Sequence, residues 1–184
     1  MAFPNQIANR NFLSPIGFKF ILTKYPKVDF FSNKASIPGI NLGVAIQPTY
    51  LKDIPVPGDK LEFGDLSLSF IVDENMENYL AIYDWLIGLG YPENVKQFDD
   101  LRAEDRYYPD RDSRDMYNQY SDGVLQIFNS NYQPKFQVKF KDLFPTSLTT
   151  LDFDATNTDY TYFTATVSFK YTVFQIRNMN DAIL

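Results

Sequence analysis

The chain has 184 residues, of which 45% are hydrophobic and 17% aromatic, and it carries a formal net charge of -6 at pH 7. This length fits one domain whose hydrophobic core is large enough to be stable without disulfides or structural metals. The absence of Cys and His excludes disulfides, thiolate metal sites, a Cys nucleophile and a Ser-His-Asp triad. The net negative charge also argues against a protein that grips nucleic acid through its phosphates.

The N-terminal residues 1–15 read MAFPNQIANRNFLSP and show no hydrophobic period, so we expect an arm without regular structure. They lack the apolar stretch of a signal peptide. No segment of the chain approaches the roughly 18 apolar residues of a membrane span. We therefore expect a soluble protein that is made in a cytoplasm and has no membrane partner.

The first third of the chain predicts short strands. Residues 16–23 alternate apolar and polar side chains, residues 30–36 are a second candidate, and residues 44–50 are expected to be extended. The following segment, LKDIPVPGDK at 51–60, is rich in Pro and Gly and predicts an exposed loop instead of a central strand.

Residues 61–72 predict a further strand, and residues 74–89 predict the most convincing helix. In the strand, Leu66, Leu68 and Phe70 are expected to share one face with Val72. Asp73 or Asn75 is expected to cap the helix. Apolar residues of the helix repeat at three and four positions: Met76, Tyr79, Leu80, Tyr83, Leu86 and Ile87. Trp85 lies among these apolar positions and is predicted to be a core residue.

Residues 91–121 predict a long insertion of mixed charge, helical near 97–106. Loops of this length are usually functional or disordered. Tyrosines interleaved with the charges favour an ordering contact with a partner. The predicted contact residues of the insertion are Tyr107, Tyr108, Tyr117 and Tyr120.

The last third predicts strands again. We expect strands at 123–129 and 135–141, a bend in the DLFPTS segment at 142–147, and one long strand at 160–175. At about 3.3 Å per residue the last strand would span roughly 50 Å. One of its faces is apolar, and the other carries small polar residues: Thr164, Thr166 and Ser168.

The loop before that strand, LDFDATNTD, crowds oxygen-bearing side chains and resembles a metal loop. An EF-hand loop needs Gly at position 6 and a bidentate acid at position 12. Counted from Asp152, these positions hold Asn157 and Phe163. The loop therefore predicts a polar turn in which Asp and Asn bond their own backbone, and we predict no metal and no cofactor.

Two alternatives to a structural role remain open at this point. A β-sandwich binding module would recognise a glycan or a protein through the tyrosines of 91–121. A hydrolase would need paired carboxylates, such as those of glycoside hydrolases. Adjacent acids such as Asp99 and Asp100 point about 100° apart in a helix, so no pair is favoured. We predict no enzyme and no catalytic residues.

Four segments in order carry a resemblance to a known family. They are SIPG at 36–39, IPVPGDK at 54–60, LSLSFIVDE at 66–74 before a helix with Trp85, and LFPT at 143–146 before LDFD at 151–154. Their order and spacing resemble the tail tube proteins of contractile-tailed bacteriophages, whose fold is shared with the inner tube of type VI secretion. The similarity covers roughly residues 16–90 and 134–174.

The resemblance implies a mainly β (α+β) fold: two packed antiparallel sheets in a β-sandwich or barrel with one flanking helix. It implies one tail-tube-like domain over 1–184. The chain departs from the family pattern in the arm 1–15, the insertion 91–121 and a C-terminal tail 175–184, which are longer than a minimal tube subunit needs. It further implies a virion structural protein whose six copies form a ring around a channel for DNA, assembled in the host cytoplasm.

The resemblance also implies surfaces and partners. Rings would stack through loops, with subunit contacts at Pro55, Pro57, Gly58 and Asp59, and Thr164, Thr166 and Ser168 would line an acidic lumen. Partners would be further copies and adjacent tube, sheath, baseplate or neck proteins. The tape measure protein and DNA would pass without specific binding. A tube initiator, a terminator or a baseplate hub protein of the same fold is the alternative role.

Overall fold

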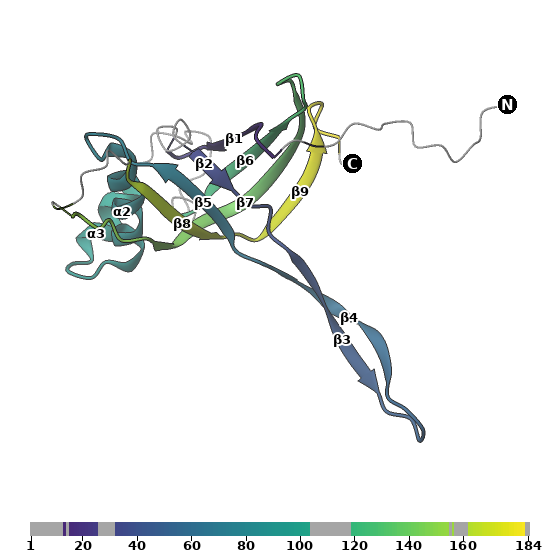
Figure 1. The fold of residues 1–184 in the computed structure, drawn as a ribbon. Coiled ribbons are helices and arrows are strands. Elements are labelled where there is room, and N and C mark those ends of the chain that lie inside the picture. Colours follow the sequence, from purple (N-terminus) through teal and green to yellow (C-terminus); the bar gives the residue numbers. More distant parts are fainter. Residues whose placement is uncertain are drawn as a thin grey trace.

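The computed structural model describes residues 13, 15–25, 32–103, 119–154, 156 and 162–182, which form a body of sheets and helices with one long projecting hairpin (Figure 1). In this part of the chain no helix is long and apolar enough to span a membrane. The elements are β1 Phe18–Leu22, β2 Ser32–Ala35, β3 Ile40–Gln47, β4 Ile54–Phe63, β5 Leu66–Ile71, α2 Glu77–Gly90, α3 Lys96–Ala103, β6 Ser121–Phe128, β7 Pro134–Leu148, β8 Thr164–Lys170 and β9 Val173–Asn178.

Strand β7 joins two antiparallel sheets. Its first half pairs with β6 and β9, and β1 extends that sheet from β6; its second half pairs with β8, and β5 and β2 follow in order. β3 and β4 form a separate two-stranded sheet. The prediction of a mainly β fold with two packed sheets and a flanking helix is confirmed. The path ends at β1 and β2, so the single chain forms an open sandwich and not a closed barrel.

The bend predicted at 142–147 was expected to end the strand before it. This expectation is wrong, because β7 continues through these residues to Leu148. Asp142 takes a left-handed φ of 57°, which Asp tolerates better than most residues. A register shift follows between Pro145 and Ser147. These two irregularities turn the strand from one sheet into the other without ending its hydrogen-bonded ladder.

The single strand predicted at 160–175 is two strands, β8 and β9, separated at Tyr171 and Thr172. The register with β7 is unchanged across this break, since Lys170 lies opposite Phe144 and Val173 lies opposite Lys141. The amide of Thr172 still donates to the carbonyl of Lys141 at 3.0 Å. The extended segment predicted from alternation therefore exists as these two strands. It bends together with β7 and continues to Asn178.

The core lies between the sheets and α2. Leu66, Leu68 and Phe70 of β5 are fully buried, as predicted from their alternation, whereas the preceding strand ends at Phe63 because Gly64 and Asp65 separate it from β5. The buried hydrophobic residues are Phe20, Leu22, Leu66, Leu68, Phe70, Ile82, Trp85, Leu101, Leu125, Val138, Phe140, Leu143, Ala165, Val167, Phe169 and Phe174.

The buried face predicted for α2 is partly wrong: Tyr79 and Leu86 do pack against the core, but they are only partly buried. The helix buries Asn78, Ile82, Trp85 and Gly88 and exposes Leu80 and Tyr83. The apolar side chains surround most of the helix, so their period alone does not fix which stripe faces inward. Trp85 decides the orientation because its ring packs 6.2 Å from Phe169, and its Nε1 donates to the carbonyl of Gln119 at 3.0 Å.

Asn78 also replaces the predicted caps. The residue that precedes the helix, Met76, takes a left-handed φ of 57° and makes no side-chain capping bond. Inside the first turn, the Asn78 amide donates to the carbonyl of Ile71 at 2.8 Å and accepts from the amide of Asp73 at 3.3 Å. Buried Asn78 thus ties the helix start to the end of β5.

The C-terminal turn is fastened to β7 by Asp181. Its carboxylate accepts a hydrogen bond from Lys139 at 2.8 Å and from Gln137 at 2.8 Å, with Arg177 at 3.7 Å. The Lys139 ammonium, through this hydrogen bond, holds the pKa of Asp181 below its usual value. The contact therefore stabilises the β9 end of the sheet only while Asp181 is ionised.

Asp181→Asn is expected to reduce stability near neutral pH and to change its pH dependence. A lowered folded-state pKa adds stability above the unfolded pKa, and this stability is lost as the pH falls through the folded value. The difference in free energy of unfolding between wild type and variant should shrink as the pH drops below about 4. Denaturant unfolding at several pH values measures it, with Asp59→Asn in the hairpin as the control. A difference that stays constant with pH would contradict this role.

Candidate functional site

The most unusual surface is the apolar face of the β3–β4 hairpin, which projects far from the body (Figure 1). Alternate residues of a strand share a face. On β3 this face is wholly apolar and solvent-exposed, with Val44 and Ile46 each 66% exposed. The register places apolar β4 residues opposite. The apolar face consists of Ile40, Leu42, Val44, Ile46, Pro55, Pro57 and Leu61, and it ends at Phe63, which packs against the body.

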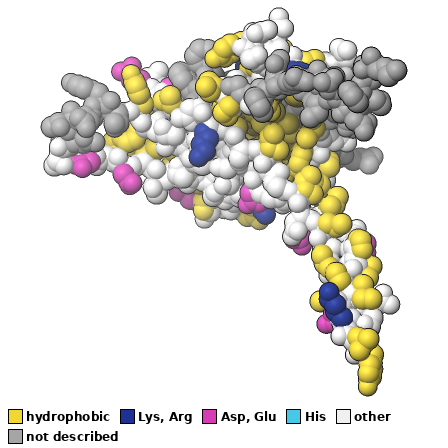
Figure 2. Space-filling model, turned by 45° about the vertical axis from the view of Figure 1, so that its right-hand side comes forward, with side chains coloured by type: hydrophobic (Ala, Val, Ile, Leu, Met, Phe, Trp, Pro, Cys, Tyr) yellow, Lys and Arg dark blue, Asp and Glu magenta, His cyan; other side chains and the backbone are white. Residues whose placement is uncertain are grey.

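Figure 2 shows hydrophobic side chains along the whole hairpin, with few charged groups among them. A hairpin of two strands is marginal in water unless it packs against something. Contiguous exposed apolar patches on soluble proteins mark interaction sites. The hairpin therefore has the features of an interaction surface.

The loop predicted at 51–60 is wrong from residue 54 onward, where strand β4 begins. Pro55 lies opposite Ile46 and Pro57 lies opposite Val44. Pro is tolerated on an edge strand where its missing N–H would face solvent, and among the described strands β4 pairs only with β3. The two prolines are two residues apart, so they occupy equivalent positions in the ladder. The expected exposure of this segment is confirmed.

Gly58 and Asp59 form an irregularity in the middle of the hairpin. The register shifts between Leu42 and Val44, where Gly43 faces the additional residues of β4. A Cβ on Gly58 would lie 2.4 Å from the carbonyl oxygen of Gly43. Only glycine allows the two backbones to approach this closely.

The base of the hairpin is clamped to the body. The Gly64 amide donates to the carbonyl of Gly39 at 2.9 Å, and the hydroxyl of Tyr171 donates to the carbonyl of Gly64 at 2.8 Å. The Tyr171 ring packs 6.1 Å from Phe63 and 5.2 Å from Phe140. Burial, and secondarily the Asp65 carboxylate, raise the pKa of Tyr171, so its hydroxyl remains a donor at neutral pH.

Tyr171→Phe is expected to lower the free energy of unfolding by about 1 kcal/mol, the usual net value of one hydrogen bond. The ring contacts stay, whereas the Gly64 carbonyl loses its side-chain donor. Denaturant unfolding checks this value. Tyr162→Phe serves as the control because Tyr162 is 84% exposed, and its change should be close to zero. Equal effects of the two variants would show that the clamp adds no stability.

A second surface is the outer face of β5, β8 and the end of β7, which carries hydroxyl side chains. Ser67 and Ser147 lie on either side of Ser168 in register. Ser69 lies opposite Thr166, with their hydroxyl oxygens 2.9 Å apart. We call this surface the hydroxyl face; it consists of Ser67, Ser69, Ser147, Thr149, Thr164, Thr166 and Ser168.

The hydroxyl face lies on the opposite side of its sheet from α2. Ala165, Val167 and Phe169, which alternate with the hydroxyl residues, are fully buried, and Trp85 of α2 packs on that inner side. The charged pair at the border of the hydroxyl face is Lys170 with Asp65, at 2.7 Å. The described part of this surface is therefore close to neutral.

The other predicted site residues divide into described and undescribed ones. Tyr107, Tyr108 and Tyr117 lie outside the described residues. Tyr120 is half-buried and packs edge to face on Phe144, with ring centres 5.7 Å apart. This contact joins the residue that precedes β6 to strand β7.

The oxygen-rich loop is a polar turn where it is described. The carboxylate of Asp154 accepts bonds from the hydroxyl and the amide of Thr156 at 2.6 and 2.9 Å. These bonds, the side-chain one first, lower the pKa of Asp154. Within the described ranges no group of acids could hold a metal ion. Asp159 lies outside those ranges.

Sequence reasoning located the hairpin prolines but missed the apolar face beside them. The signal was present, because Ile40, Leu42, Val44 and Ile46 alternate without a break. We expected an extended segment only from Val44, and we separated it from 51–60 as a loop. Reading both segments as one hairpin would have revealed the face.

Together these features define a class of protein: a β scaffold that presents surfaces for assembly. The family model described as phage tail tube protein matches residues 1–177. The chain therefore belongs to the phage tail tube protein family, whose members are structural proteins and not enzymes.

Solved structures share this fold. The anti-feeding prophage tube-terminating cap superposes with a TM-score of 0.64 at 17% identity, covering 97% of this chain and 99% of its own. The sheath–tube complex of the extracellular contractile injection system PVC gives 0.57 at 15% identity, with 97% and 100% covered. The six-fold symmetrised anti-feeding prophage baseplate gives 0.56 at 16% identity, with 96% and 97% covered. A search of curated protein sequences finds no match.

Proposed function

We propose that this chain is the repeating subunit of a ring, with six copies, in the tube of a contractile phage tail or in a ring at the end of that tube. The observation that carries this proposal is the exposed apolar face of the hairpin. An isolated subunit would leave that face in water, whereas stacked subunits cover it. Burial of apolar surface stabilises by about 25 cal/mol per Å², so covering this face would favour assembly.

Two observations support a closed ring. In the described part of the chain, β1 and β2 are the ends of the sheet path and β9 pairs only with β7, so each offers an edge for a neighbouring strand. The similar baseplate structure was solved with six-fold symmetry. Heterologous contacts of this kind close into rings when the rotation allows it. The ring would carry the chain's single tail-tube-like domain, with the arm 1–15 and the insertion 91–121 attached. The predicted tail 175–184 begins inside β9, so its first residues belong to the sheet.

We assign the hydroxyl face to the lumen and α2 to the outside, since the two lie on opposite sides of one sheet. A neutral hydroxyl surface makes no strong contact with phosphates, and the net charge of -6 of the chain repels them. DNA and the tape measure protein would pass along Thr164, Thr166 and Ser168 without specific binding. From the sequence we expected an acidic lumen. Because the hydroxyl face carries only Ser and Thr, we propose instead that the lumen lining is polar and neutral.

The outer side and the two rims would meet the remaining partners: sheath, adjacent tube rings, and baseplate or neck proteins, in the virion tail after assembly in the host cytoplasm. Similar folds serve as a tube-terminating cap, in a sheath–tube complex and in a baseplate. A tube subunit and an end-ring subunit both use the hairpin for stacking. They differ in whether stacking continues beyond one ring.

Size-exclusion chromatography with electron microscopy of the purified chain tests the proposal. We expect rings or tubes about 80–100 Å across, as barrels of many strands require. Single rings indicate an end-ring subunit, and long tubes indicate a tube subunit. A monomer at high concentration without rings would overturn the proposal.

Thr164→Cys is expected to separate lumen from exterior, because the chain contains no other Cys. In assembled tubes a small maleimide should label the thiol, whereas a maleimide carried by a folded protein should be excluded at least tenfold relative to the free subunit. Tyr83→Cys on the exposed side of α2 is the matched control and should react with both reagents. Equal labelling of Thr164→Cys by both reagents would place the hydroxyl face outside.

A further inference from the structure

The tip of the hairpin presents two large apolar side chains and one cation. Tyr50 and Leu51 are 101% and 94% exposed. Thr49 fastens the turn, since its hydroxyl accepts from the amide of Lys52 at 3.3 Å and donates to the carbonyl of the same residue. Within the described chain the Lys52 ammonium makes no ion pair. Aromatic and large apolar residues held on a fixed turn are typical of interface anchors.

A hollow of about 300 Å³ lies between α2 and α3. Its apolar lining includes Ile87 and Leu101, and its acidic lining consists of Asp84 and Asp100. Gly88 makes this packing possible, because a Cβ there would lie 2.9 Å from the Cβ of Leu101. Neither carboxylate makes an ion pair with another described residue.

The tip and the hollow complement each other in chemistry. The hollow offers an apolar floor for Tyr50 or Leu51, and its two carboxylates match the Lys52 cation. Asp53, the next residue after Lys52, leads directly into β4, which begins at Ile54, so it belongs to the start of the hairpin shaft. Opposite charges at such a rim steer association and fix its orientation.

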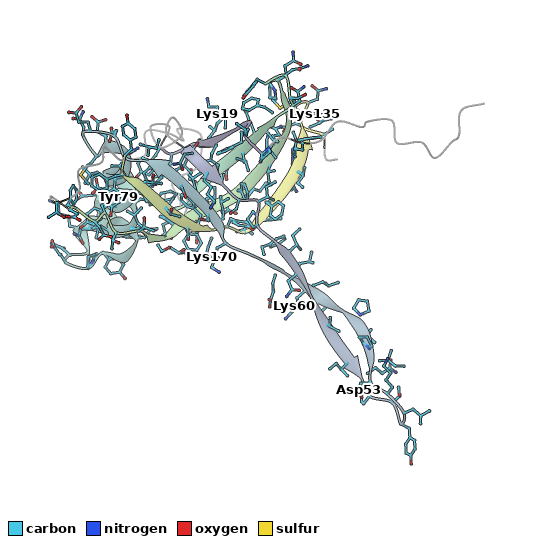
Figure 3. The ribbon with its side chains drawn as sticks, in the orientation of Figure 1. Lys19, Asp53, Lys60, Tyr79, Lys135 and Lys170 are labelled. Atoms are coloured by element: carbon cyan, nitrogen blue, oxygen red, sulfur yellow. The ribbon has the colours of Figure 1, made fainter. Side chains whose placement is uncertain are left out.

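Tip and hollow cannot meet within one chain. Figure 3 shows Asp53 at the far end of the hairpin, whereas Tyr79 marks α2 on the opposite side of the body. Figure 1 shows α2 and α3 together at that side. A contact between them joins one copy to the next head to tail, and such contacts propagate or close into rings.

We propose that the hairpin tip of one subunit docks into the α2–α3 hollow of a second copy, with Leu51 and Tyr50 on the apolar floor and Lys52 between Asp84 and Asp100. This inference rests on the proposed function, because it requires copies to assemble. It adds the receiving surface, which the apolar face of the hairpin does not specify. The tip then fixes the position of each subunit relative to the next one.

Charge reversal tests the ionic part of the contact. Lys52→Glu should raise the protein concentration needed for assembly about tenfold, equivalent to about 1.4 kcal/mol, as measured by sedimentation and electron microscopy. Asp84→Lys combined with Asp100→Lys should have a similar effect, and adding Lys52→Glu to this pair should restore assembly. Lys60→Glu on the shaft of the hairpin is the control. If the combined variant assembles no better than the single ones, the ionic contact is absent.

Cysteine cross-linking tests the position directly, because the chain has no native Cys. Leu51→Cys with Gln97→Cys, a residue that lines the hollow, should give disulfide-linked ladders under mild oxidation of assembled protein. Leu51→Cys with Tyr132→Cys, in the exposed turn before β7, should give none. If wild type assembles but the first pair forms no ladder, this inference fails while the proposed function stands. If wild type does not assemble, both fail.

Discussion

Trp85→Ala is expected to lower the free energy of unfolding by about 3–5 kcal/mol, as large-to-small changes of buried aromatic residues do. Trp85 is fully buried, with its ring 5.6 Å from Tyr25 and 6.2 Å from Phe169. Its removal opens a cavity beneath β8 and takes the Nε1 donor from the carbonyl of Gln119. Since domains are stable by about 5–15 kcal/mol, the variant would approach the threshold of folding.

Urea unfolding followed by far-UV circular dichroism measures this loss, because the variant has no Trp for fluorescence. Tyr83→Ala is the matched control: the same helix loses an aromatic ring, but this ring is 47% exposed. Its effect should stay within about 0.5 kcal/mol. Equal losses in the two variants would refute the observed orientation of α2 and favour the one predicted from periodicity.

The comparison of these two residues shows why the fold was predictable from the sequence and the helix orientation was not. Strand alternation has a period of two, and each of Leu66, Leu68 and Phe70 has a small polar neighbour that excludes the other face. Helix α2 has apolar residues on most of its circumference. Which stripe is buried depends on the shape of the sheet that receives it, and in this case on the space for an indole ring.

The bends of the long strands were also beyond sequence reasoning. Pro145 and the Asp142 segment gave a turn signal, and that signal was real, since φ of Asp142 is positive. Its consequence depended on partners: β8 and β9 follow β7 through the turn in one register, so the pairing continues. Local chemistry predicted the irregularity, and only tertiary pairing decided that the strand goes on.

The candidate surfaces divide in the same way. The alternation of apolar and polar residues predicted that Thr164, Thr166 and Ser168 share a polar outer face. The structure places small hydroxyl residues of β5 and β7 beside them. The hairpin was seen only in part, because its prolines indicate a loop unless the strand has a free edge. The α2–α3 hollow had no sequence signal, since it depends on how closely two helices approach at Gly88.

Gly58→Ala is expected to abolish assembly while leaving the body folded. A Cβ at this position would lie 2.4 Å from the carbonyl oxygen of Gly43, a backbone atom that cannot move without breaking the bulge. The hairpin contributes no side chain to the group of fully buried core residues, so the melting temperature should change by no more than about 2 °C. The concentration needed for rings or tubes should rise at least tenfold.

Gly39→Ala is the matched control, because a Cβ there meets no atom within 4 Å and Gly39 lies at the base of the same hairpin. It should assemble as wild type does. Val44→Asp offers an independent variant that keeps the bulge but places a charge on the apolar face, and it should fail to assemble for a different reason. If Gly58→Ala forms tubes while Val44→Asp does not, the apolar face mediates assembly but the shape of the bulge is irrelevant. If both form tubes at the wild-type concentration, the hairpin is not the assembly surface, and burial of its apolar face cannot be the driving force for stacking.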